Sequence, residues 1–204
     1  MKTQTRELQA NTTPETALQY LKEGNARFVQ DKKANRDLLE QVRTTSKGQF
    51  PFAVVLGCID SRVPAELVFD QGIGDIFNVR IAGNIVNSDI LGSLEFACKV
   101  AGARLILVLG HTRCGAVNGA ISGAGLGNLT GLLQKIGPAI DRVKRTSLSP
   151  DDDRFANEVV SQNVREVADE VLARSDILAE MEAAGEIAVA RAVYAVETGE
   201  VTFY

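Results

Sequence analysis

The chain has 204 residues, of which 45% are hydrophobic and 24% charged, a composition typical of a globular protein that buries a sizeable core. The 22 basic and 26 acidic side chains leave a formal net charge of −4, which argues against a broad electrostatic grip on nucleic acid or on an anionic membrane. The single histidine, His111, excludes any site that needs two histidines, and three cysteines are too few for a disulfide-stapled mini-protein.

We expect a single domain over residues 1–204, because no linker and no internal repeat divides the chain. Residues 1–12 are polar and predict a loose arm. Thr13 followed by Pro14 predicts the start of a helix, and a second short helix is predicted over residues 36–45. The N-terminal residues lack the apolar stretch of a signal peptide, and no apolar run reaches the length of a membrane span. We therefore expect a cytoplasmic protein that has no membrane partner.

Two uninterrupted apolar runs, at Phe52–Gly57 and Leu105–Gly110, end in glycine. Apolar runs without alternation are typical of strands buried on both faces, as in a parallel sheet. The other predicted elements are strands over residues 76–79, 187–196 and 201–203, helices over 88–101, 153–174 and 175–184, and a hairpin turn over 197–200. This order predicts an α/β fold with a mostly parallel central β-sheet, flanking helices, an N-terminal helical arm and a C-terminal hairpin.

Side chains with metal-binding chemistry follow both apolar runs directly. Cys58 follows the first run, with Asp60 two residues later, and His111 follows the second, with Cys114 three residues later. Because the carboxyl ends of parallel strands lie at the same edge of a sheet, we expect these side chains to meet there. Thiolate, imidazole and carboxylate groups suit tetrahedral Zn²⁺. The residues therefore predict one zinc ion per chain, with Asp60 or water in the fourth position.

Arg62 bears on whether this site is open or closed. It lies two residues after Asp60, so a bidentate ion pair can hold the carboxylate away from the metal. If Asp60 instead stays on the metal, four protein ligands close the site, and the protein binds zinc without catalysis. Structural zinc sites usually contain paired Cys-x-x-Cys motifs, which this sequence lacks, so we favour an open site.

These motifs resemble a known family. The sequence C-I-D-S-R at Cys58–Arg62, followed by H-T-R-C-G at His111–Gly115, is similar to the paired motifs of the β-class carbonic anhydrases. The resemblance extends from about Pro14 to the C-terminus and includes the segments Val63–Glu66 and Asp75–Arg80. It implies the β-carbonic anhydrase fold.

The resemblance also implies an activity, which is zinc-dependent reversible hydration of carbon dioxide to bicarbonate and a proton by attack of zinc-bound hydroxide. Cys58, His111 and Cys114 would be the zinc ligands, and Asp60 and Arg62 the catalytic pair, with Asp60 as an exchangeable fourth ligand. A related activity on the same scaffold, hydrolysis of CS₂ or another heterocumulene, could use the same ligands, so the motifs do not separate the two.

Substrate-binding residues are implied by the same resemblance. They are Gln49, Phe77, Ala82, Gly83 and Phe96. Family members usually contribute Gln49, Phe77 and Phe96 across a dimer interface, so a homodimer or a dimer of dimers is implied.

Overall fold

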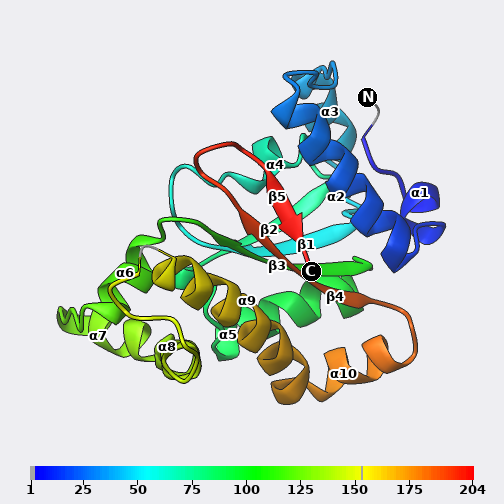
Figure 1. Cartoon of the computed structure of the whole chain (residues 1–204). Coiled ribbons are helices and arrows are strands. Elements are labelled where there is room, and N and C mark those ends of the chain that lie inside the picture. Colours follow the sequence, from blue (N-terminus) through cyan, green and yellow to red (C-terminus); the bar gives the residue numbers. More distant parts are fainter. Residues whose placement is uncertain (1–2, 153) are drawn as a thin grey trace.

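The computed structural model describes residues 3–152 and 154–204, which form one five-stranded sheet with helices on both faces (Figure 1). The strands are β1 (Ala53–Gly57), β2 (Ile76–Arg80), β3 (Leu105–His111), β4 (Ala188–Tyr194) and β5 (Val201–Phe203). Their order in space is β2-β1-β3-β4-β5. Strand β1 pairs parallel with β2 and β3, β3 pairs parallel with β4, and β5 runs antiparallel to β4. The predicted mostly parallel sheet and C-terminal hairpin are both confirmed.

Helices account for most of the remaining chain. They are α1 (Arg6–Ala10), α2 (Pro14–Val29), α3 (Leu38–Thr45), α4 (Ala65–Val68), the 3₁₀ turn η1 (Ala82–Asn84), α5 (Ser88–Glu95), the π-helical turn η2 (Phe96–Val100), α6 (Gly115–Ile121), α7 (Gly127–Gln134), α8 (Gly137–Lys144), α9 (Phe155–Arg174) and α10 (Asp176–Ala183). Within the described ranges, no helix combines the length and the apolar character needed to cross a membrane.

The sheet separates two hydrophobic cores because its central strands are buried on both faces. Val54 and Leu56 of β1 pack on one face against helices that include α5, α8, α9 and α10. Ala53 and Val55 of the same strand pack on the other face against α2 and α4. Figure 1 shows these two helical layers on opposite sides of the sheet. Burying a side chain the size of valine or leucine contributes roughly 1.5–3 kcal/mol, which explains why the two runs lack alternation.

Several helix boundaries follow from local capping. The Thr13 side chain accepts a hydrogen bond from the Thr16 backbone N–H, and α2 begins at Pro14, as predicted. The predicted helix over 88–101 is divided, because the Ala101 N–H bonds to the Phe96 carbonyl, five residues earlier, in the π-helical turn. The predicted start of the next helix, at Asp153, lies outside the described residues.

The expected loose arm over residues 1–12 is wrong for residues 6–10, which form α1. Gln9 of this helix is buried, and its amide donates to the Pro51 carbonyl at 2.7 Å and to the Ala101 carbonyl at 2.8 Å. These partners lie far away in sequence, so local composition gave no sign of them. Residues 1 and 2 of the expected arm lie outside the described residues.

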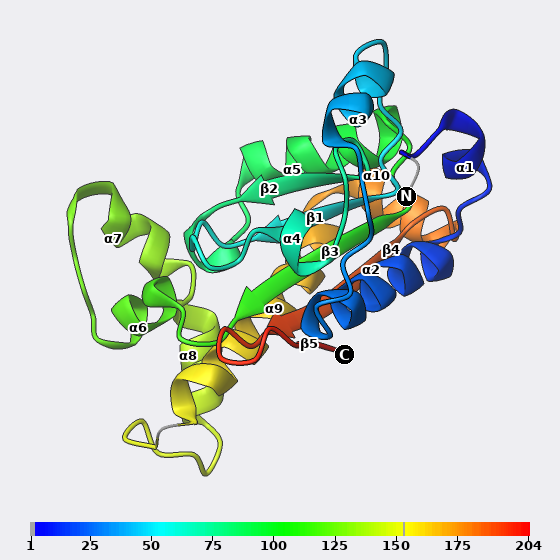
Figure 2. The same cartoon turned by 90° about the horizontal axis from the view of Figure 1, so that it is seen from above.

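The site lies at the edge where the parallel strands end. Gly57, the last residue of β1, pairs with Leu109 near the end of β3, so the chain leaves both strands at the same edge. Figure 2 shows α6 and α7 beyond the end to which the β3 arrow points. The two loops that follow β1 and β3 therefore face each other.

Candidate metal centre

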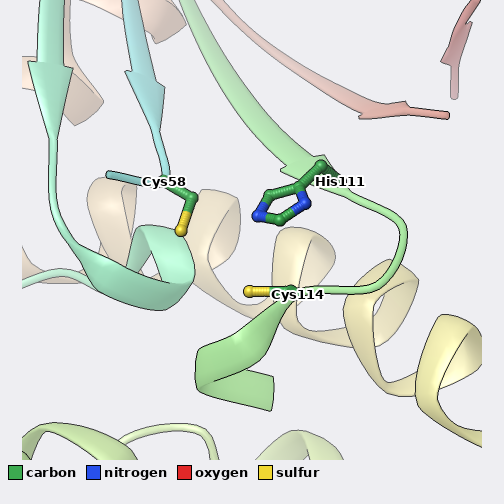
Figure 3. A group of neighbouring side chains, drawn as sticks. All are labelled: Cys58, His111 and Cys114. Carbon is green, nitrogen blue, oxygen red and sulfur yellow. The ribbon is translucent and has the colours of Figure 1, made fainter. Parts of the chain in front are cut away.

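Cys58, His111 and Cys114 converge at this edge of the sheet (Figure 3). Cys58 directly follows β1, His111 is the last residue of β3, and Cys114 directly precedes α6. Their ligand atoms all lie within 4.8 Å of one another. The three residues are only 4%, 1% and 2% exposed, respectively. The structure thus brings together the three residues that the sequence predicted as ligands, in a group able to hold a metal ion.

The His111 ring is oriented as a metal ligand would be. Its Nδ1 lies 2.8 Å from the Thr112 carbonyl oxygen, which can only accept, so Nδ1 carries the proton. The other nitrogen, Nε2, is buried and has no well-aligned hydrogen-bond partner among the described residues. A buried acceptor without a partner is costly, and a metal ion at the centre of the group would satisfy it.

The two thiols compete for protons. The hydrogen bond from Cys114 lowers the pKa of Cys58, and the hydrogen bond to Cys58, together with burial, raises the pKa of Cys114. One buried thiolate therefore opposes the formation of the other. A divalent cation between the sulfur atoms would stabilise both charges, so this donor set fits Zn²⁺.

Asp60 and Arg62 form the predicted bidentate ion pair. Arg62 Nε donates to Asp60 Oδ1 at 2.9 Å and Nη2 donates to Oδ2 at 2.7 Å. This fork holds the pKa of the Asp60 carboxyl well below its usual range. Asp60 Oδ2 lies 3.9 Å from His111 Nε2, so this carboxylate borders the group of candidate ligands.

The residues predicted to bind substrate are divided between two places. Ala82 and Gly83 lie in η1, and the Gly83 N–H donates to the Cys58 sulfur at 3.4 Å. Phe77 and Phe96 contact each other edge to face, with ring centroids 6.3 Å apart. Both phenylalanines line a hollow of about 590 Å³ between β2 and α5, whose lining does not include Cys58.

Gln49 is not near the metal ligands of its own chain. It is exposed in the segment between α3 and β1, and Cys58 follows the other end of β1. The whole strand therefore separates the two residues, and contact between Gln49 and a metal centre across a dimer interface stays a prediction.

Arg80 is a site residue whose role the sequence did not indicate. Its side chain donates to the Cys58 carbonyl at 2.8 Å and to the Asp60 carbonyl at 2.6 Å. These bonds fix the backbone between the first ligand and the carboxylate. The position of Arg80 explains this role, because it is the last residue of β2 and pairs with Gly57 at the end of β1.

Glu197 has a similar role for the second loop. It accepts from the Thr112 hydroxyl at 2.7 Å and from Arg113 Nε at 2.5 Å. The Arg113 carbonyl in turn accepts from Arg62 Nη2 at 3.3 Å. The sequence indicated only a hairpin turn at Glu197, and no pattern linked that turn to a loop so far away in the chain.

Comparisons with known proteins agree with this geometry. A family model described as "Carbonic anhydrase" matches residues 53–201. "Carbonic anhydrase 2" of Mycobacterium tuberculosis is 39% identical over 93% of this chain and 92% of that protein, and the "Carbonic anhydrase" of Mycolicibacterium smegmatis is 37% identical over 94% and 93%. The crystal structure of the β-carbonic anhydrase CafA of Aspergillus fumigatus superposes with a TM-score of 0.72 at 27% identity, covering 93% of this chain and 89% of that chain. The chain belongs to the β-class carbonic anhydrase family.

Proposed function

We propose that this protein catalyses the zinc-dependent, reversible hydration of carbon dioxide to bicarbonate and a proton. Family membership supports the reaction. The observation that carries the proposal is the buried group of two sulfur atoms and one unpartnered imidazole nitrogen, bordered by the ion-paired Asp60. Cys58, His111 and Cys114 would hold the metal, and Asp60 or water would take the fourth position.

A bound zinc ion would lower the pKa of a water molecule so that hydroxide is available near neutral pH. The protein's own groups have two tasks. Arg62 keeps Asp60 anionic and holds it in one orientation. The carboxylate then accepts a hydrogen bond from the attacking oxygen and aims its lone pair at the carbon of CO₂.

We also infer that the active form is a homodimer or a dimer of dimers. Gln49 is exposed and is separated from Cys58 of its own chain by the length of β1, so we infer that it acts on substrate in a neighbouring subunit. Phe96 is exposed beside β2, an edge strand of the sheet, where a second subunit would bury it. Together with Ala82 and Gly83, Phe96 would line a narrow pocket, largely apolar, that suits CO₂.

The substitution Cys58→Ser tests the proposal. We expect it to abolish both bound zinc and CO₂ hydration, measured by metal analysis and by stopped-flow assay. Cys98→Ser is the matched control, because Cys98 is also buried but lies in η2, and burial raises the pKa of its thiol to about 12. The control should keep zinc and activity. Full activity of Cys58→Ser without metal would refute the proposal.

Assays on the same purified protein distinguish two rival functions. A heterocumulene hydrolase would turn over CS₂ faster than CO₂, although it would use the same ligands. A non-catalytic zinc protein would contain zinc but show no hydration across the neutral pH range.

A further inference from the structure

The Cys58 sulfur accepts a hydrogen bond from the backbone of a neighbouring turn. Its donor is the N–H of Gly83, at 3.4 Å, in the turn η1 that follows β2. In Figure 3 this turn passes beside the Cys58 side chain. Gly83 has φ +68°, and a Cβ there would lie 2.8 Å from Ile136 Cδ1 and 3.3 Å from Ala116 Cβ. Only glycine therefore lets the backbone approach the sulfur in this conformation.

Helix α9 contacts the same glycine through a hydrogen bond. Asn163 is 2% exposed, and its amide donates to the Gly83 carbonyl at 2.9 Å. The two residues are 80 positions apart in sequence. Gly83 thus has its carbonyl bound to a buried amide and its N–H directed at the sulfur of a candidate metal ligand. The amide therefore helps to hold η1 in the conformation that directs this N–H at the sulfur.

We propose that Asn163 is a positioning residue of the metal centre, which acts through Gly83 on the Cys58 thiolate. The inference rests on the proposed zinc function. An N–H···S hydrogen bond withdraws charge from a thiolate and so limits the electron density that the sulfur gives to a metal. The opposite view is that Asn163 only satisfies a buried carbonyl and contributes to folding stability alone.

The variant Asn163→Leu, close to asparagine in shape, separates these views in the cobalt-substituted protein. Without the amide, the Gly83 N–H is no longer directed at the sulfur, which becomes a stronger electron donor. We expect the sulfur-to-cobalt charge-transfer band to move to lower energy. Because η1 no longer helps to hold the Cys58 side chain in place, we also expect chelators to remove the metal about 10–100-fold faster.

Gln9→Met is the matched control. Gln9 is also a buried amide that donates to carbonyls, but it lies on α1 and bonds to Pro51 before β1 and Ala101 before β3, at the opposite edge of the sheet. Its loss should lower the melting temperature but leave the band and the metal release rate unchanged. If Asn163→Leu behaves in the same way, Asn163 is merely structural and the inference is overturned.

If Asn163→Leu fails to fold, a measurement on the parent protein tests the inference instead. In protein loaded with ¹¹³Cd, the hydrogen bond predicts a scalar coupling between the Gly83 amide proton and the metal through the Cys58 sulfur. Uptake of cadmium with no such coupling would overturn this inference alone. A protein that takes up no cadmium would overturn the proposed function and this inference with it.

Discussion

Two aspartate–arginine pairs of this chain, each two positions apart in the sequence, form the same ion pair in different places. In Asp60–Arg62 and again in Asp152–Arg154, the arginine side chain binds the carboxylate two residues earlier. The distances agree, with 2.9 Å from Nε to Oδ1 and 2.7 Å from Nη2 to Oδ2 in both pairs. In both, the arginine backbone N–H also bonds to Oδ1. The short spacing alone is therefore enough to form the ion pair.

The surroundings of the two pairs differ. The Asp60 and Arg62 side chains are 17% and 49% exposed, against 28% and 76% for Asp152 and Arg154. Asp60 also lies beside His111 and has its carbonyl bound by Arg80. Arg154 lowers the pKa of Asp152 to about 2, much as Arg62 depresses that of Asp60. An ionised, oriented carboxylate is thus common to both, and the surroundings, above all the neighbouring thiols and imidazole, distinguish the candidate catalytic pair.

The largest difference is expected when the two carboxylates are neutralised. We expect Asp60→Asn to lower CO₂ hydration by about 10²–10⁴-fold, the range typical for loss of a group that orients or accepts a proton in the reaction. Asp152→Asn should leave the rate unchanged, because its carboxylate has no such neighbours. Stopped-flow assays of both variants at equal zinc content measure this. Equal losses in the two variants would show that location at the sheet edge is not what matters.

Removal of the arginines should have a smaller effect. In Arg62→Ala, Asp60 loses the hydrogen bonds that lower its pKa, so it becomes protonated at a higher pH than in the parent. We expect a rate loss of about tenfold at neutral pH, because the carboxylate is free to move, and a shift of the acid limb of the pH–rate profile to higher pH. Arg154→Ala, the control, should change neither. A shift to lower pH would contradict the role given to Arg62.

The smallest effect is expected at Glu197, which holds the second loop through Thr112 and Arg113. In Glu197→Ala, the Arg113 carbonyl, which accepts a hydrogen bond from Arg62, is less well fixed. We therefore expect the hydration rate to fall roughly fivefold. Glu200→Ala is the control in the same turn, because Glu200 bonds to Thr198 rather than to the ligand loop. If both variants lose activity equally, the hairpin turn supports the site without a specific contribution from Glu197.

The sequence by itself determined the mostly parallel sheet and the three candidate metal ligands. Strands buried on both faces need continuous apolar runs, and Phe52–Gly57 and Leu105–Gly110 are such runs. Cys58 and His111 follow them directly, so the rule that parallel strands end at one edge was sufficient to bring these residues together. The Asp60–Arg62 pair was predictable as well, because a spacing of two residues suffices to form it.

Only the tertiary structure decided which groups support these residues. Asn163 and Glu197 bond to residues of the site that lie 80 and 84 or more positions away, and nothing in the local sequence distinguishes them from other polar side chains. Residues 6–10 were expected to be loose for the same reason, although Gln9 is anchored in the interior. Periodicity and spacing report on neighbours along the chain, whereas these contacts exist only once the helices have packed against the sheet.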